Sequence, residues 1–365
     1  MRVLVVTRWF PDSHSAMSGV FNMRDCRLLA EDHDVTVLHL GSSDPDVRLS
    51  DSLRVVRVPF RTKDIRPGGT VRPLLRRMLG EADFLHTMAY PTLTAFLGLP
   101  VNIPWVHTEH YSLLVAKAPS RRAGLLVSAP MRRLLRRPDE VIAVGQELAA
   151  AIRRSGASSV SVIGNDVALP GEGTPLPESL STTSPIRMIA TGGLVLNKGP
   201  VEAVRATALL RDRGYDVSLT WAGGGPLREE SEQAARELGI EESVQFLGHV
   251  DTAQIPELLR EHQLFLLPTA YETFGVSIAE AIAQGLPVVV SGTGEFQSFL
   301  PPRGSRVVRD RTPEALADAV ESLVHDGERS SSEELRTYAA SAFGAETRKE
   351  GYRKVYQSAT DSRGR

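Results

Sequence analysis

The sequence predicts an α/β protein made of two Rossmann-like, doubly wound domains that face each other across a cleft. Short apolar runs alternate with amphipathic stretches, a pattern typical of βαβ units and parallel sheets. The alternation stops in an irregular stretch near the middle of the chain and then starts again. The length of 365 residues also suits two domains of roughly 150–200 residues each. Because doubly wound sheets bind ligands at the carboxyl ends of their strands, we expect a ligand between the two halves.

The expected first domain covers residues 1–165. Its opening run, RVLVVT at Arg2–Thr7, predicts a buried strand, and a loop at 8–18 leads into a helical pattern at 20–30. Further strands are predicted at 34–40, 53–58, 83–87, 103–107, 140–144 and 159–163.

Residues 166–184 are rich in Gly, Pro, Ser and Thr and lack periodicity, which predicts an interdomain linker. The strand and helix patterns resume over 185–345, the expected second domain. Strands are predicted there at 186–190, 217–222, 244–247, 264–267 and 287–290, and helices at 200–212, 227–238, 255–260 and 276–284. Residues 346–365 are expected to form a helix that packs back toward the first domain and frays over its end, TDSRGR.

Composition and charge narrow the classes of function. A net charge of −2 gives no overall field that favours nucleic acid, so nucleic acid is not an expected partner. The single cysteine, Cys26, cannot form an intramolecular disulfide, which fits a reducing compartment. The apolar run near the start is too short for a membrane span or for the core of a signal peptide. We therefore expect a cytoplasmic protein.

The most informative stretch, residues 264–295, contains two glutamates eight positions apart, Glu272 and Glu280. Glu272 lies in a loop after a predicted strand, and Glu280 lies about one turn into the next helix, where it can accept two hydrogen bonds from a ribose. Phe274 and Gly275 lead into the N-terminus of that helix, whose free N–H groups favour an anion. The stretch predicts a diphosphate site between two carboxylates. A helix with an acidic, solvated face is the plainer interpretation.

Two glycine-rich loops follow other predicted strands of the second domain. In the first, Lys198 precedes a helix, where its ammonium group can neutralise a phosphate, although a solvated lysine is the alternative. In the second, Gly223 and Gly224 let a ligand ring approach the backbone, and a tight turn without a ligand explains them equally well. The patterns GxxxxGK[ST] and GxGxxG are not satisfied in these loops, which argues against a P-loop and a nicotinamide site.

The first domain offers two histidines at the end of the strand predicted at 103–107. Either His107 or His110 can be catalytic, and we prefer His110; a metal site is the minority interpretation because His-x-x-His lacks further ligands at familiar zinc spacing. The segment from Lys117 to Arg137 is basic and contains no acidic residue. A solvated helix is the favoured interpretation of this segment, and contact with an anionic acceptor or with the inner face of a membrane is the alternative.

Together these motifs resemble the signature of family 4 glycosyltransferases with the GT-B fold, along most of the chain from Val3 to about Tyr356. In the second half the resemblance rests on Glu272-x7-Glu280 with Phe274, Gly275, Ala281, Gly285 and Pro287-Val288-Val289, on Gly192 to Lys198-Gly199, on Gly223-Gly224-Gly225-Pro226, and on Phe246-x-Gly248-x-Val250. Ile163-x-Asn165 precedes the expected linker. In the first half it rests mainly on Pro11, Gly19 and His110.

The resemblance implies a retaining transferase that moves a hexosyl group from a nucleoside diphosphate sugar, with a UDP sugar as the first candidate. The acceptor would be a hydroxyl group of a small molecule, a glycan or a lipid-linked molecule, and neither a metal nor another cofactor would be required. A nucleotide-sugar epimerase and a catalytically inactive nucleotide-binding protein of the same fold are the alternatives.

The resemblance also implies roles for individual residues. His110, Glu272 and Lys198 would be catalytic, with Lys198 stabilising the leaving diphosphate and His110 close to the anomeric carbon. Glu280 would hold the ribose. The residues implied in donor binding are Gly19, Gly193, Lys198, Gly223, Gly224, Val250, Glu272, Thr273, Phe274, Gly275 and Glu280.

The sequence departs from the family pattern at Gly193, where many relatives carry arginine. A second cation for the phosphates would then be missing or supplied elsewhere, with Arg8 and Arg24 as candidates. The acceptor is expected to contact loops of the first domain at 8–18, 61–70 and 111–120, whose composition names no ligand.

Overall fold

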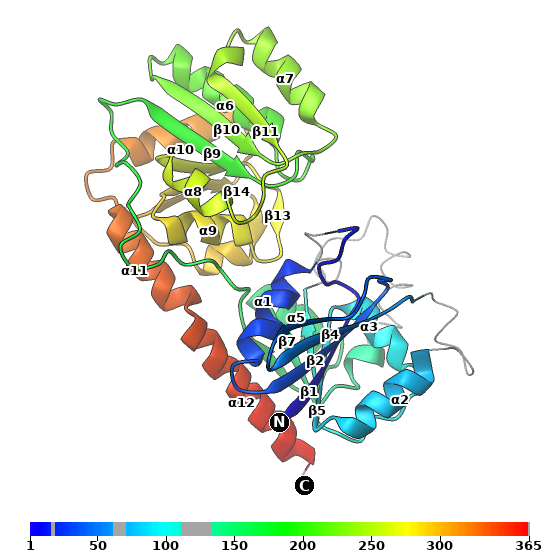
Figure 1. Cartoon of the computed structure of the whole chain (residues 1–365). Coiled ribbons are helices and arrows are strands. Elements are labelled where there is room, and N and C mark those ends of the chain that lie inside the picture. Colours follow the sequence, from blue (N-terminus) through cyan, green and yellow to red (C-terminus); the bar gives the residue numbers. More distant parts are fainter. Residues whose placement is uncertain (16–18, 61–70, 111–132, 364–365) are drawn as a thin grey trace. The chain divides into compact units, whose positions relative to one another are not determined.

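The computed structural model describes residues 1–15, 19–60, 71–110 and 133–363, and the chain forms two compact units (Figure 1). The first unit contains Met1–Asp166 together with Ala345–Arg365, and the second contains Val167–Gly344. Each unit is built around one sheet of mostly parallel strands.

The first unit has an eight-stranded sheet in the order β3-β4-β2-β1-β5-β6-β7-β8, in which β3 alone runs antiparallel to its neighbour. The chain reverses its direction of travel across the sheet between β1 and β5, which makes the ends of these strands the switch point. The strands are β1 (Arg2–Thr7), β2 (Asp34–Leu40), β3 (Val47–Ser50), β4 (Leu53–Val58), β5 (Phe84–Met88), β6 (Trp105–Glu109), β7 (Glu140–Ala143) and β8 (Val160–Val162). The helices of this unit include α1 (Val20–Leu29), α2 (Val71–Glu81), α3 (Tyr90–Leu93), α5 (Gln146–Arg154) and α12 (Ala345–Arg363).

The second unit has six parallel strands in the order β11-β10-β9-β12-β14-β16, so its switch point lies between β9 and β12. The strands are β9 (Ile186–Thr191), β10 (Val217–Ala222), β11 (Val244–Gly248), β12 (Leu264–Leu267), β14 (Val288–Ser291) and β16 (Ser305–Val308). Helices α6 (Pro200–Asp212), α7 (Arg228–Glu237) and α10 (Pro313–Val324) pack together, as do α8 (Ile255–Arg260), α9 (Val276–Gln284) and α11 (Ser332–Phe343). These two groups are the helix layers of a doubly wound sheet.

Burial separates the strands that the sequence predicts from those that it does not. Every residue of β12 and β14 is buried, which is why both appear as unbroken apolar runs. The edge strand β3 is exposed at all of its residues and was not predicted. The half-buried β16 was not predicted either, because a strand that is only partly buried need not form an unbroken apolar run.

The stretch 166–184, predicted as a linker, belongs almost wholly to the second unit. Arg336 of α11 donates hydrogen bonds of 2.7 and 2.5 Å to the carbonyl oxygens of Thr174 and Pro175, and Arg329 donates one of 2.8 Å to that of Leu180. Arginine side chains thus satisfy a backbone without regular structure. The composition correctly indicated irregular backbone, but such a backbone can still pack on a domain.

Helix α12 (red in Figure 1) ends the chain but packs in the first unit. Tyr352 and Tyr356 are in the core of that unit, where the ring of Tyr356 stacks on Phe84 at 4.1 Å. The Tyr356 hydroxyl is hydrogen-bonded to Nδ1 of His86 at 2.9 Å. The predicted fraying from residue 360 is wrong as far as Arg363, which remains helical and donates a 2.8 Å hydrogen bond to Asp139.

A buried charged cluster fixes α12 to the rest of the first unit. The Arg348 guanidinium contacts the Asp25 carboxylate of α1 and donates hydrogen bonds of 2.9 Å to Asp166 and 3.0 Å to the carbonyl oxygen of Gly164. Burial raises the pKa of Asp25, and the positive charge of Arg348 opposes that effect. The cluster therefore joins α12 to Asp166, the residue at which the chain leaves the first unit.

Replacing Arg348 with Met is expected to lower the free energy of unfolding of the first unit by about 3–5 kcal/mol, because it leaves the Asp25 charge buried without its cationic partner. The matched control is Arg353→Met on the same helix, which breaks a half-exposed ion pair with Asp32 and should cost about 1 kcal/mol or less. Urea unfolding in a Trp221→Phe background measures both, since Trp9 and Trp105 then report on the first unit. Equal losses in the two variants would contradict the importance of the cluster.

Candidate functional site

The two strands at the switch point of the second unit each lead into a loop that carries a predicted catalytic residue. Lys198 follows β9, and Glu272 follows β12. Because β9 and β12 are neighbours and parallel, their loops leave the same edge of the sheet at the same place. Nζ of Lys198 lies 2.5 Å from Oε1 of Glu272. The side chains of Lys198 and Glu272 are 19% and 12% exposed, so the ion pair is largely shielded but can still be reached from solvent.

The loops are fixed to each other through the residue before Lys198. The carbonyl oxygen of Asn197 accepts a 2.7 Å hydrogen bond from the amide of Ala270, and the Asn197 side chain donates one of 2.9 Å to the carbonyl oxygen of Tyr271. Gly199 has a φ of +67°, and a Cβ there would lie 2.4 Å from the carbonyl oxygen of Pro268. The close approach therefore requires glycine, and it places Lys198 opposite Glu272.

Two residues of this site were not identified from the sequence. The buried Thr269 donates a 2.8 Å hydrogen bond from its hydroxyl to Oε1 of Glu272. Arg311, which precedes α10, donates a 3.0 Å hydrogen bond to the carbonyl oxygen of Leu196 and pairs with Glu202 of α6 at 2.9 Å. Thr269 lies within the glutamate motif and could have been considered. The sequence gives no signal that brings Arg311, more than 100 positions from Lys198, to this loop.

Helix α9 begins beside this pair. Its N-cap is Gly275, with a φ of 92°, so the chain turns sharply after Glu272 and Thr273. The side chain of Phe274 is buried, with its ring 4.9 Å from that of Phe299, so only the backbone of Phe274 can contact a ligand. The first N–H groups of α9 and the ammonium of Lys198 are the expected anion-binding groups. Glu280 lies half-buried in the second turn.

The glycines of the loops after β9 and β10 divide into those that packing requires and those that it does not. A Cβ at Gly223 would lie 1.9 Å from the carbonyl oxygen of Gly192, and one at Gly225 would lie 2.4 Å from that of Leu194. At Gly224 a Cβ would contact nothing within 4 Å, and at Gly193 its nearest neighbour would be 3.7 Å away. Packing between loops thus explains Gly223 without a ligand, whereas Gly193 and Gly224 stay open to one.

The remaining predicted residue of this unit, Val250, follows β11 and is half-buried. It lies two strands away from β9 in the sheet. The structure therefore brings Lys198, Glu272 and the open glycines to one edge of the sheet and places Val250 at its far end.

In the first unit the structure distinguishes the two histidines. His107 is buried, with Nδ1 3.0 Å from the Thr87 hydroxyl and Nε2 3.3 Å from the Glu109 carboxylate, so both ring nitrogens have partners. His110 packs its ring 4.3 Å from Phe21, and its Nε2 is buried without a hydrogen-bond partner. Burial, followed by the neighbouring His107, lowers the pKa of His110 to about 3. The geometry favours a structural role for His107 and leaves a neutral imidazole at His110 for chemistry.

Gly19 is the other predicted residue of the first unit. It caps α1 with a φ of 69°, and a Cβ there would lie 2.1 Å from the carbonyl oxygen of Trp9. Packing of the loop after β1 against the start of α1 is therefore enough to explain this glycine. Its predicted contact with phosphates stays a prediction.

The basic segment lies mostly outside the described residues, as do the predicted acceptor loops at 61–70 and 111–120. At its described end, Arg137 donates a 2.6 Å hydrogen bond to the carbonyl oxygen of Leu99 and lies over the ring of Trp105 at 5.1 Å. Arg137 therefore has a structural role. Within the described ranges, no helix combines the length and the apolar character that a membrane crossing needs.

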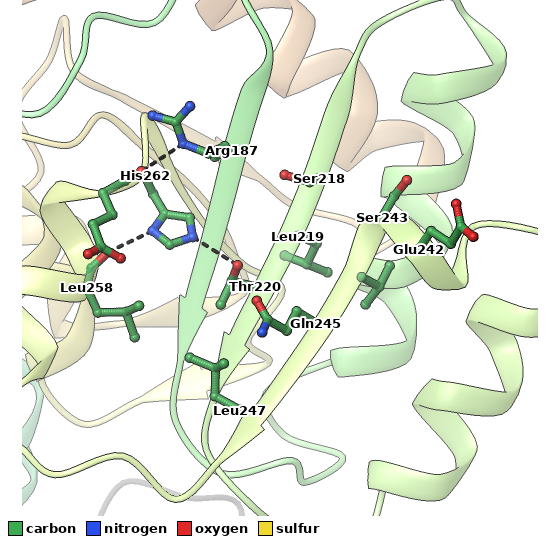
Figure 2. Close-up of a pocket in the computed structure, with 12 residues that line it drawn as sticks. Arg187, Ser218, Leu219, Thr220, Glu242, Ser243, Gln245, Leu247, Leu258 and His262 are labelled. Carbon is green, nitrogen blue, oxygen red and sulfur yellow. Dashed lines mark hydrogen bonds between the residues drawn. The ribbon is translucent and has the colours of Figure 1, made fainter.

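A hollow of about 790 Å³ lies on one face of the second unit's sheet (Figure 2). Ser218 and Thr220 of β10 point into it, and Nε2 of His262 contacts the Thr220 hydroxyl at 2.9 Å. The hollow lies toward the amino ends of β9 and β10, whereas Lys198 and Glu272 follow the carboxyl ends of their strands. Polar and apolar side chains both line the hollow, as expected for a partly solvated face of a sheet, and it is separate from the candidate site.

Comparisons with known proteins match the two halves of the chain to two different family descriptions. Residues 26–169 match the family described as Glycosyltransferase Family 4, and residues 177–342 match Glycosyl transferases group 1. The chain resembles the structure of sucrose-phosphate synthase from Thermosynechococcus elongatus with a TM-score of 0.73 and 19% identity, covering 99% of this chain and 100% of the other. It resembles HepE from Anabaena in complex with UDP and glucose with a TM-score of 0.72 and 18% identity, covering 97% and 99% of the two chains.

A curated relative is more similar in sequence over a shorter range. The GDP-mannose-dependent alpha-(1-6)-phosphatidylinositol dimannoside mannosyltransferase of Mycobacterium tuberculosis is 35% identical over 150 residues, which are 41% of this chain and 38% of the relative. The match thus spans about two fifths of the length of that relative.

Replacing Gly223 with Ala is expected to lower the free energy of unfolding of the second unit by more than about 2 kcal/mol. The new methyl group would clash with the Gly192 carbonyl oxygen, and the φ of +152° is unfavourable for alanine. Gly224→Ala is the matched control, since its added methyl group has free space; it should change stability by about 0.5 kcal/mol or less. Differential scanning calorimetry compares the two variants, and similar shifts would refute the packing explanation.

Proposed function

We propose that this chain, which belongs to the family 4 glycosyltransferases with the GT-B fold, transfers a hexosyl group from a nucleoside diphosphate sugar to a hydroxyl group with retention of anomeric configuration. The observation that carries the proposal is the pair of Lys198 and Glu272 at the switch point of the second unit, next to the N-terminus of α9. This arrangement offers a cation, free N–H groups and a carboxylate within one small site.

Each group of the site has a chemical task in such a transfer. When the bond between the sugar and the diphosphate breaks, negative charge develops on the phosphate oxygens, and the Lys198 ammonium with the first N–H groups of α9 would stabilise it. The Glu272 carboxylate would accept hydrogen bonds from hydroxyl groups of the donor sugar. Glu280, in the second turn of α9, would do the same for the ribose.

The nucleotide base of the donor has two candidates. HepE in its complex binds UDP and glucose, which supports the UDP sugar that the sequence predicts. The mycobacterial relative uses GDP-mannose, which supports a GDP sugar as the second candidate. The acceptor would be a small molecule, a glycan or a lipid-linked molecule, and screening with the identified donor would distinguish these classes.

His110 is proposed to act in the transfer from the first unit. Its low pKa makes the imidazole neutral at pH 7, so Nε2 can accept or donate a hydrogen bond without bringing a charge to the anomeric carbon. This role, and independence of metal ions, stay predictions.

A thermal-shift screen against UDP, GDP, ADP, dTDP and their common sugars, with and without Mg²⁺, tests the proposal. A ligand at 100 times its Kd should stabilise the second unit by about 2.7 kcal/mol. A metal-independent response to one nucleotide identifies the donor class, and NMR of the product then determines the anomeric configuration. No response to any nucleotide would overturn the proposal. Consumption of the donor without an acceptor would indicate an epimerase instead.

Replacing Lys198 with Ala is expected to lower kcat about 100-fold or more, because one preorganised charge that stabilises the leaving diphosphate is lost. The control is Lys354→Ala, which removes a lysine that is 74% exposed on α12 in the first unit, and it should leave kcat unchanged. Steady-state kinetics with the identified donor measures both. A loss of less than threefold in Lys198→Ala would make Lys198 an ordinary surface residue.

A further inference from the structure

We propose that Thr269 is a positioning residue for the transfer: its hydroxyl group holds Glu272 in place when the donor diphosphate draws Lys198 away. The inference rests on the proposed function and adds to it a residue whose hydroxyl group lies 2.8 Å from the Glu272 carboxylate. It follows from three features of the site, namely the hydrogen bond of Thr269, the rigidity of its backbone and the sharing of one carboxylate oxygen.

The Thr269 hydroxyl has one proton and three oxygen atoms within reach. Oε1 of Glu272 is nearest at 2.8 Å, while the carbonyl oxygens of Asn197 and Tyr271 lie at 3.2 and 3.3 Å. A hydrogen bond to a charged acceptor is stronger than one to a neutral carbonyl, so both distance and charge direct the proton to the carboxylate. Thr269 is fully buried, and water therefore does not compete for this proton.

The backbone of Thr269 is a rigid support. Its amide donates a 2.8 Å hydrogen bond to the carbonyl oxygen of Leu267, and its carbonyl oxygen accepts one of 2.9 Å from the Ser291 hydroxyl. A Cβ at Gly292 would lie 2.4 Å from that same carbonyl oxygen, so the next loop packs closely against it. Thr269 is therefore held by β12, by the last residue of β14 and by Gly292 after it, independently of any ligand.

Lys198 and Thr269 donate to the same oxygen of Glu272. The ammonium lies 2.5 Å from Oε1, and a diphosphate that arrives with two or more negative charges competes with the carboxylate for it. When Lys198 turns to the phosphates, of these two donors the Thr269 hydroxyl remains on Oε1. It keeps Oε1 in place and leaves Oε2 free to accept a hydrogen bond from the donor sugar.

The variant Thr269→Val removes the hydroxyl and keeps the shape of the side chain. We expect kcat to fall about 10-fold to 100-fold, the size expected from losing a hydrogen bond to a charged group. The Kd for the nucleoside diphosphate alone should change less than twofold, because the variant keeps Lys198, the side chain that would contact the phosphates. Thr269→Ser retains the hydroxyl and should restore kcat to within about threefold of the original chain.

The matched control is Thr207→Val in α6. Thr207 is as buried as Thr269, but its hydroxyl donates only within its helix, to the carbonyl oxygen of Ala203 at 2.9 Å. It should leave kcat unchanged. If Thr269→Val does not fold, Thr269→Ala gives the same comparison without the added methyl group. A kcat within threefold of the original, or equal losses in the Val and Ser variants of Thr269, would overturn the role.

Crystal structures of the Lys198→Ala variant and of the Lys198→Ala, Thr269→Val double variant test the positioning without relying on turnover, because both lack the ammonium group that otherwise holds Oε1. We expect the Glu272 side chain to occupy one rotamer in the single variant and to move or divide between rotamers in the double variant. An unchanged Glu272 carboxylate would refute the proposal. If the original chain binds no nucleotide, the transferase proposal fails separately, and the rotamer of Glu272 still decides whether Thr269 positions it.

Discussion

The candidate site depends on the hydrogen bonds that join the loop after β9 to the loop after β12. Parallel neighbours at a switch point deliver two loops to one edge of the sheet, but the topology alone places them only roughly. Asn197 fixes the register between them through its carbonyl oxygen and its side-chain amide, and Gly199 permits the contact with Pro268. The backbone of Lys198 is held between these two anchors, at a position from which its side chain reaches Glu272.

Further contacts extend this constraint to the rest of the second unit. Strand β13 (Tyr271–Glu272) pairs with β15 (Thr293–Gly294), and a Cβ at Gly294 would lie 2.0 Å from the carbonyl oxygen of Glu272. The loop after β14 thus supports Glu272 from one side, while Arg311 holds the Lys198 loop from the other. The connections after β9, β12, β14 and β16 thus converge on one ion pair, which is how the geometry of a site can be held without a ligand.

The parts of the molecule that were predictable from the sequence are those in which burial requires a recognisable pattern of apolar residues. The apolar runs at β12 and β14 and the glutamate motif between them indicated a strand, a loop and a helix, and the structure confirms all three. The edge strand β3 has no such pattern because it is exposed. The backbone at 166–184 has none because side chains of arginines distant in the sequence hold it in place. Thr269 and Arg311 were missed for a related reason: each acts through a single hydrogen-bonding group, whose partner only the fold brings near.

The glycines of the site show where the fold restricts the chemistry and where it does not. Gly199, Gly223 and Gly294 are required by backbone contacts that any Cβ would break. Gly193 is not required, since its φ is not positive and a Cβ would meet its nearest atom only at 3.7 Å. The backbone there would accept a side chain, so the lack of a second cation in this loop is a property of the sequence and not a demand of the fold. Under the proposed function, charge stabilisation at this edge of the sheet would rest on Lys198 and the N-terminus of α9, and the contacts that orient Lys198 would matter correspondingly more.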